Sequence, residues 1–405
     1  MISYKTFFEK MKDVKFRDIL SFGKFFLAIP IAQTKRKKRS NLWLVCEDGL
    51  RASDNGYAFF EYVRKEHPEQ DIAFAIDSKS PEYKKVAKLG ETVHTGSLQH
   101  WVYYLMAEHN ISSQKSGKPN AAVCYFLEIG GFIKNSRIFL QHGITINDSK
   151  WIYYPQTKFE MFVCAAKPEY EFVLEKFQYP KDKVRYLGFP RYDRLHKVKK
   201  DPNLIVIMPT WRNWLKLASK NDTQNTIEQE VENSQYIKAW NDLLNDKRFI
   251  SILEKYDMKA LFYPHRNMQE YLNLFNSSNS RVVLADWKEY DIGDLIEKGS
   301  FLITDYSSVF FDFVYCKKPV AFYQFDVEKY REKQLQKGYF DYFNNPFGKC
   351  TTKLSELIEE VESIVSNGCD VSEKFLEGHK KYFPLYDDSN SFRVYKAIKS
   401  LTPGE

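Results

Sequence analysis

From Asn41 onward the chain alternates short apolar runs with helix-like segments, in two successive series. This alternation predicts parallel sheets whose strands are joined by helical crossovers. The expected strands are 42–46, 72–76, 111–113, 138–141 and 161–165 in the first series, and 204–208, 260–263, 282–285, 301–304 and 319–323 in the second. We therefore expect an α/β protein with two Rossmann-like domains, which a chain of 405 residues can accommodate.

The expected parts are a basic amphipathic segment (1–40), an N-terminal domain (41–195), a C-terminal domain (204–385) and a final helix (386–405). The polar stretch 196–203 between the two domains is the expected linker. Residues 213–235, rich in Asn, Gln, Ser, Glu and Lys, interrupt the second domain and are expected to form a loop or lid. The six cysteines lie far apart without a CxxC motif, which suits a reducing cytoplasmic setting and argues against a zinc site.

The net charge of +7 is concentrated at one end of the chain. Residues 1–40 hold 11 Lys and Arg against 3 Asp and Glu, so the remainder is nearly neutral. A nucleic-acid-binding face is therefore not expected. The basic segment also carries large apolar residues at helical spacing and ends in the cluster Lys35, Arg36, Lys37, Lys38 and Arg39.

That composition predicts a helix lying on an anionic membrane surface. Its apolar run, 25–32, is too short to span a bilayer. The alternative is a helix docked on the protein's own core, followed by a basic linker.

The segment 301–313 reads as a buried strand, a polar turn and a helix. Asp305 ends the strand, Ser307 and Ser308 lie where the helix begins, and Asp312 follows one turn later. Hydroxyls beside the N–H groups of a helix start suit a phosphate, and Asp312 could accept hydrogen bonds from a sugar. The alternative is an ordinary helix cap without a ligand.

Two other predicted strands end in a similar way. The run 204–208 leads into Pro209, Thr210, Trp211 and Arg212, and the run 261–263 leads into Pro264, His265 and Arg266. Open α/β sheets bind ligands at the carboxyl ends of their strands. We therefore expect Thr210, Arg212, Arg266 and the 305–312 turn to share one nucleotide pocket.

A candidate base follows another apolar strand, at His142 before Gly143. An imidazole with an ordinary pKa near 6.5 can act as a general base at neutral pH. The alternative is a histidine that bonds to a neighbouring loop.

Taken together, these segments resemble the CDP-glycerol glycerophosphotransferases of teichoic acid synthesis, with the related CDP-ribitol and capsule enzymes. The resemblance covers residues 135–345 and rests on His142-Gly143, Pro209-Thr210-Trp211-Arg212, Pro264-His265, Thr304-Asp305-Tyr306-Ser307-Ser308 with Asp312, Lys318-Pro319, Asp326, Tyr330, and Lys337-Gly338-Tyr339 with Asp341. Two motifs depart from the family pattern: the chain has Gln141-His142-Gly143-Ile144-Thr145 where Trp-His-Gly-Thr-Pro is frequent, and Asn213 where Asp is frequent.

The resemblance implies a GT-B fold, with two domains facing across a cleft, and a peripheral enzyme at the cytoplasmic face of the cell membrane. Its donor would be CDP-glycerol or CDP-ribitol, and its acceptor a polyprenyl-diphosphate-linked or polymer hydroxyl. His142 and His265 would be the catalytic pair, and Ser307 and Ser308 would hold the donor's phosphates.

In the expected reaction, an acceptor hydroxyl attacks the phosphorus that carries the alditol, and CMP leaves. His142 would take the proton, while His265, Arg212 and Arg266 would stabilise charge on the phosphates. No carboxylate cluster resembles a metal site, although Asp305 could hold Mg²⁺.

Two other functions stay open at this point: a GT-B glycosyltransferase that uses a nucleotide-sugar, and a non-catalytic membrane-associated scaffold for envelope assembly. The clustering of two histidines with a phosphate turn argues against the scaffold. The alditol, the acceptor, the number of units added and the oligomeric state are also open.

Overall fold

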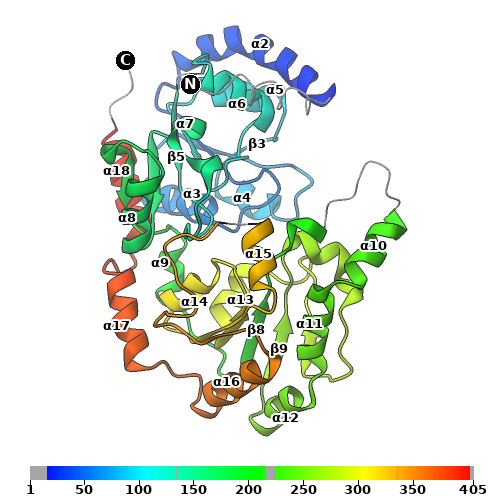
Figure 1. Cartoon of the computed structure of the whole chain (residues 1–405). Helices are drawn as coiled ribbons and strands as arrows, with labels where there is room; N and C mark the ends of the chain where they lie inside the picture. The colour runs from blue at the N-terminus through cyan, green and yellow to red at the C-terminus, as the bar shows by residue number, and fades with distance from the viewer. Residues whose placement is uncertain (1–15, 134, 216–223, 335, 402–405) are drawn as a thin grey trace. The chain divides into compact units, whose positions relative to one another are not determined.

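The structure, a computed structural model, describes residues 16–133, 135–215, 224–334 and 336–401. Contacts divide the chain into two compact units. Unit 1 comprises residues 1–144, 150–193 and 387–405, and unit 2 comprises residues 145–149 and 194–386. Each unit is built on one parallel sheet with helices packed around it (Figure 1), which confirms the predicted α/β class.

The sheet of unit 1 has seven strands in the order β3-β2-β1-β4-β5-β6-β7, all parallel. The strands are β1 (Trp43–Cys46), β2 (Ile72–Ala75), β3 (Glu91–Val93), β4 (His109–Ser112), β5 (Ser136–Phe139), β6 (Met161–Cys164) and β7 (Val184–Tyr186). The helices are α2 (Phe16–Arg36), α3 (Asn55–Glu66), α4 (Tyr83–Leu89), α5 (Leu98–Met106), α6 (Ala121–Ile129), η1 (Lys150–Ile152), α7 (Tyr154–Thr157), α8 (Lys167–Lys176), η2 (Lys181–Lys183), α9 (Tyr192–Leu195, at the boundary) and α18 (Asn390–Lys399).

The sheet of unit 2 has six strands in the order β10-β9-β8-β11-β12-β13, again all parallel. The strands are β8 (Leu204–Met208), β9 (Lys259–Phe262), β10 (Val282–Leu284), β11 (Phe301–Thr304), β12 (Val320–Tyr323) and β13 (Cys350–Thr351). The helices are η3 (Asn213–Leu215), α10 (Gln224–Glu232), α11 (Gln235–Asn245), α12 (Lys247–Lys255), η4 (Arg266–Leu274), α13 (Ile292–Lys298), α14 (Phe310–Tyr315), α15 (Val327–Lys333), α16 (Leu354–Ser366) and α17 (Glu373–Tyr382).

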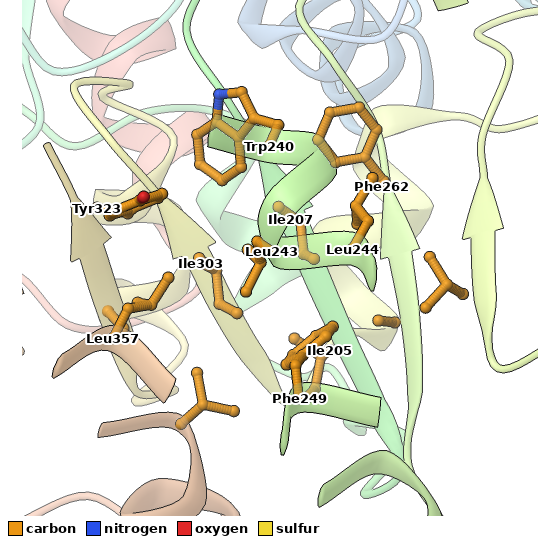
Figure 2. Packing of buried hydrophobic residues seen from close by; sticks show 14 of the residues in the cluster. Ile205, Ile207, Trp240, Leu243, Leu244, Phe249, Phe262, Ile303, Tyr323 and Leu357 are labelled. Atoms are coloured by element: carbon orange, nitrogen blue, oxygen red, sulfur yellow. The ribbon is translucent and has the colours of Figure 1, made fainter. Parts of the chain in front are cut away.

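The core of unit 2 is organised around Trp240 of α11, which is fully buried. Its ring centroid lies 5.7 Å from that of Tyr323 on β12 and 6.1 Å from that of Phe262 on β9. Figure 2 shows these rings above Ile207 and Ile303, which belong to the two central strands. Because helices cover these central strands, the strand sequences are almost continuously apolar. The pairing of β8 with β11 fixes where their carboxyl ends lie relative to each other.

Helix α2 is docked on unit 1. Phe25, Ala28 and Ala32 are buried in a cluster with Trp101 of α5, and the Trp101 indole donates to Ser21 Oγ at 3.1 Å. The expectation of a helix docked on the protein's own core is therefore correct for this face of α2. Residues 1–15 of the predicted basic segment lie outside the described residues.

Two segments differ from their expected arrangement. Part of the predicted loop 213–235 is helix α10, in which Val231 is fully buried, while residues 216–223 are outside the described part. Helix α18 is not a separate terminal element: it packs on α3, and Tyr395 stacks on His67 with ring centroids 3.7 Å apart. The chain thus returns to unit 1 after completing unit 2.

Candidate active site

Several predicted site residues of unit 2 lie along one edge of its sheet. Strands β9, β8 and β11 are parallel neighbours, so the residues that follow them lie side by side. His265 follows β9, Thr210 follows β8, and Ser307 with Ser308 follow β11. The backbone N–H of Thr210 donates to Asp305 Oδ1 at 2.8 Å, which ties two of these strand ends together.

The turn after β11 leads into a helix, as the sequence predicts. Val309 N–H donates to Ser307 Oγ at 3.4 Å, and the first helical bonds run back to the carbonyls of Ser307 and Ser308. Both serines are partly exposed. Helix α14 has only six residues, so the serine hydroxyls are a stronger basis for binding an anion than the helix itself. Asp312 is 4% exposed, which leaves little of its surface for a sugar.

Arg212 and Asp305 form a buried ion pair that supports the strand ends instead of facing a ligand. Arg212 is fully buried, and its guanidinium lies 2.7 Å from Asp326 Oδ2 and 2.8 Å from Asp305 Oδ2. The rings of Tyr306 and Tyr330 lie 5.0 and 5.1 Å from the guanidinium carbon. We therefore reassign Arg212 and Asp305 from phosphate contact to holding the strand ends together, because buried charges are retained in close pairs.

His265 lies on the same edge with an exposed side chain. Its Nδ1 accepts a hydrogen bond from the backbone N–H of Asn267 at 3.2 Å. In a neutral imidazole, this bond puts the ring proton on Nε2, which then acts as a donor. The ring lies over that of Trp211, with centroids 6.1 Å apart. His265 can thus donate a hydrogen bond to an anionic oxygen.

A cavity of about 380 Å³ lies beyond His265, at the ends of β9 and β10. Its lining residues are Arg266, Asn267, Gln269, Glu270, Asp286, Trp287 and Lys288. The Arg266 guanidinium lies 5.3 Å from the Trp287 ring centroid. Gln269 bonds to the carbonyls of Pro264 and Ala285 and accepts from Trp287 N–H, so it holds the two cavity loops together.

Trp287, in this cavity, was not among the site residues predicted from the sequence. The available signal was its position: like Trp211, it is an aromatic residue shortly after a predicted strand of the second series.

His142 follows β5 in unit 1. A hydrogen bond between the ring and the Ser113 backbone raises the pKa. Desolvation, followed by the charge of Arg191, outweighs it and lowers the pKa of His142 to about 4. The side chain still reaches the surface. His142 is therefore a neutral imidazole at pH 7 with one nitrogen that accepts a proton.

The outer face of α2 is apolar and exposed. Phe16, Ile19, Leu20, Phe26 and Leu27 are 74%, 62%, 56%, 56% and 63% exposed. No helix in the described part of the chain is long and apolar enough to cross a membrane.

The basic cluster after α2 divides in two. Residues 35–38 are exposed, but Arg39 pairs with Asp71 and Glu91, so its charge is used within unit 1.

The described residues contain no group of three or more His, Cys, Asp or Glu side chains placed to hold a metal ion. Asp305 is enclosed by Arg212, Thr210 N–H and Tyr306 N–H. We therefore assign no metal-binding role to Asp305.

Comparison with known proteins gives a match over most of the chain. Residues 27–400 match the family described as CDP-glycerol:poly(glycerophosphate) glycerophosphotransferase. The minor teichoic acid biosynthesis protein GgaB of Bacillus subtilis (strain 168) is 30% identical over 90% of this chain and 40% of its own length. The teichoic acid poly(glycerol phosphate) polymerase of the same organism is 23% identical over 97% of this chain and 53% of its own length. The chain thus spans about half or less of these two relatives.

Solved structures support the GT-B-like fold. The wall teichoic acid polymerase TagF superposes with a TM-score of 0.61 at 18% identity, covering 95% of this chain and 99% of that one. A UDP-GlcNAc 2-epimerase from Neisseria meningitidis, bound to UDP-GlcNAc, gives a TM-score of 0.51 at 12% identity, covering 89% of this chain and 100% of that one.

Proposed function

Because the chain belongs to the CDP-glycerol:poly(glycerophosphate) glycerophosphotransferase family, we propose that it transfers an alditol phosphate, from CDP-glycerol or CDP-ribitol, to an acceptor hydroxyl in teichoic acid or capsule synthesis. The observation that carries this proposal is the edge of unit 2, where His265, two serines and a cavity that contains Trp287 lie at the carboxyl ends of parallel strands. A TagF variant has been solved with CDPG, which supports a CDP-alditol donor for this chain.

The donor would lie along this edge. The cytosine ring would enter the cavity and stack on Trp287, with Arg266 beside it. The phosphates would accept hydrogen bonds from His265 Nε2 and from the Ser307 and Ser308 hydroxyls. These donors replace water around the charge that moves onto the leaving CMP.

His142 would act as the general base. The acceptor hydroxyl gives its proton to the ring nitrogen that does not bond to Ser113, and the oxygen attacks the phosphorus carrying the alditol. The bond from this phosphorus to the bridging oxygen breaks, and CMP leaves with the electron pair. The product is a phosphodiester, and the proton on His142 passes to solvent.

The acceptor would be a polyprenyl-diphosphate-linked or polymer hydroxyl presented at the cytoplasmic face of the membrane. The exposed apolar face of α2, with the basic residues 35–38 after it, supports peripheral binding to anionic lipid. Arg39 is left out of this surface because of its two ion pairs.

The test incubates the purified chain with CDP-glycerol, CDP-ribitol, UDP-sugars and CMP-sugars, together with lipid-linked acceptors. CMP release with a product heavier by one alditol phosphate supports the proposal, and the same products identify the alditol and the number of units. Sugar transfer without alditol phosphate would show a glycosyltransferase. If the chain shows neither turnover nor CMP binding, the non-catalytic scaffold is the function that remains.

A further inference from the structure

The backbone immediately before His142 has an unusual conformation. Gln141 has φ of +59°, which residues with a Cβ adopt only where surrounding contacts stabilise it. The carbonyls of Leu140 and Gln141 belong to this turn, just after the last residue of β5. Such groups need hydrogen-bond partners because Leu140 and Gln141 are themselves buried.

Asn55, at the start of α3, supplies both partners. Its side chain is fully buried, and Nδ2 donates to the Gln141 carbonyl at 2.6 Å and to the Leu140 carbonyl at 3.3 Å. Its Oδ1 accepts from the backbone N–H of Arg191 at 3.3 Å. One amide thus connects α3, the end of β5 and the segment after β7.

The side chain of Gln141 anchors the same turn from the other side. Its Nε2 donates to the Val163 carbonyl at 2.6 Å and to Glu169 Oε1 at 2.9 Å. Glu169 is itself buried and accepts from the backbone N–H of Ala165 at 2.8 Å. Gln141 is therefore held by β6 and the start of α8.

Ser113, the backbone partner of the His142 imidazole, is held by Gly56, the residue after Asn55. Gly56 N–H donates to Ser113 Oγ at 2.7 Å, and Ser113 is the residue whose backbone bonds to the His142 ring. A Cβ at position 56 would lie 2.9 Å from Glu47 Cγ and 3.0 Å from Ser113 Oγ, so a larger residue would crowd this contact. The first turn of α3 thus contacts both the backbone before His142 and the residue that orients its ring.

We propose that Asn55 and Gln141 are positioning residues that hold the His142 imidazole in one orientation and one tautomer. Both side chains are buried, so we assign neither a contact with the substrate. The inference rests on the proposed function only in taking His142 as the base; the geometry itself does not depend on it.

The experiment compares full-length Asn55→Ala with Asn110→Ala, a control in the same unit. Asn110 is also buried, 6% exposed, and its Nδ2 donates to the Tyr104 carbonyl at 3.0 Å. Asn55→Ala should lower kcat about 10–100-fold with little change in the KM for the CDP-alditol, because the base is misplaced while the donor site is intact. Asn110→Ala should change neither kcat nor KM.

Nitrogen NMR of histidine-labelled protein provides a readout independent of activity. The His142 signals, identified by their loss in His142→Ala, should show one tautomer in the wild type and a changed tautomer ratio in Asn55→Ala. Gln141→Asn keeps a residue that tolerates positive φ but shortens the anchor, so it carries the test if Asn55→Ala does not fold.

If the folded variants keep wild-type kcat and unchanged His142 signals, the inference is overturned. If the wild type releases no CMP but its His142 signals still respond to Asn55→Ala, the proposed function fails and the positioning role stands.

Discussion

At the scale of single residues, the two candidate catalytic histidines each bond to a backbone group. His265 accepts from a backbone N–H at Nδ1, so its other nitrogen carries the proton. His142 bonds to the Ser113 backbone, and its other nitrogen is the one that we propose accepts the proton. These bonds accompany the roles that we propose: His265 stabilises phosphate charge and His142 removes a proton.

We expect His142→Ala to lower turnover about 10²–10⁴-fold, because the acceptor hydroxyl loses its base. Donor affinity should barely change, since the proposed donor site lies in unit 2. The measurement is initial CMP release, with calorimetric titration of CMP. His94→Ala is the matched control because His94 is an exposed histidine of unit 1 that bonds to Ser78. Near-normal turnover in His142→Ala would remove this residue from the mechanism.

The lowered pKa of His142 has consequences for both activity and stability. The base should remain unprotonated below pH 6.5, and its protonation should reduce kcat/KM only as pH approaches about 4. Between pH 6.5 and about pH 4, the unfolded chain binds a proton at His142 that the folded chain does not. The free energy of unfolding therefore falls as the pH falls through this range.

A pH–rate profile and urea unfolding at pH 7 and 5 test this expectation, with His142→Asn as the variant. The variant should lose less stability than the wild type on acidification. An acid limb of the rate profile near 6.5 would contradict the expected environment of the ring.

On the donor edge, we expect Trp287→Ala to weaken CMP binding by about 1–3 kcal/mol through lost base stacking.

On the same edge, the combined substitutions Ser307→Ala and Ser308→Ala should weaken CDP-alditol binding, because phosphate oxygens lose hydrogen bonds worth about 1–3 kcal/mol each. Calorimetry measures both, and Trp151→Ala, an exposed tryptophan of unit 1, is the control. Unchanged affinity in all three substitutions would place the nucleotide elsewhere.

At the scale of structural elements, α2 shows how one helix can have two apolar faces with different roles. One face completes the core of unit 1 around Trp101, and the other is exposed. A chain that starts at Asn41 would therefore expose that core as well as lose the outer face. Substitution of the outer face tests membrane binding more cleanly than deletion does.

We expect the triple variant Leu20→Ser, Phe26→Ser and Leu27→Ser to lose most binding to anionic liposomes while keeping CMP binding. Each buried apolar side chain contributes about 1.5–3 kcal/mol, and each basic residue near the surface about 1 kcal/mol. Sedimentation with liposomes at low and high salt measures this, and Phe392→Ser is the control because Phe392 is exposed elsewhere in unit 1. If the triple variant sediments like the wild type, the membrane contact lies elsewhere.

The buried Arg212 works at the same scale. It joins the segment after β8 to Asp305 after β11 and to Asp326 before α15. These three segments carry or flank the predicted phosphate site. Arg212, which the sequence suggested as a phosphate ligand, therefore supports this site by holding the three segments together.

At the scale of the whole molecule, the chain leaves unit 1 and returns to it twice. The last return brings in α18, where Val394 and Ile398 are fully buried. Asn390 donates to Asp193 Oδ1 from both its backbone N–H and its side chain, at 2.7 and 2.8 Å. Helix α18 therefore contributes to the stability of unit 1.

We expect a chain that ends at residue 386 to destabilise unit 1 selectively, because the surface of α3 and the Trp43 ring lose their cover. In thermal unfolding, the transition of unit 1 should move to a lower temperature than in the wild type. CMP binding by unit 2 should persist at temperatures below that transition. The point variant Val394→Asp should act in the same direction, and Lys396→Ala, on the same helix, should not. Loss of CMP binding in the folded truncated chain would contradict this division.

The local pattern of the sequence was sufficient to predict the α/β class, most central strands and the motifs at their ends. Alternating apolar strands and amphipathic helices reflect burial within each element, which the sequence records directly. Short edge strands such as β3 and β13 were missed because only two or three residues form them and their burial is partial. The strand–turn–helix at Ser307 was predictable because its chemistry is contained in adjacent residues.

Only the tertiary structure decided which charged and polar groups pair across long distances in the chain. Arg212 and Asp326 are 114 residues apart, and Asn55 and Gln141 are 86 apart, so no local pattern could predict their bonds. The same holds for Arg39, whose partners lie on two other segments of unit 1. The sequence determines where polar side chains stand along the strands, but burial and partners decide whether each one serves the site or the fold.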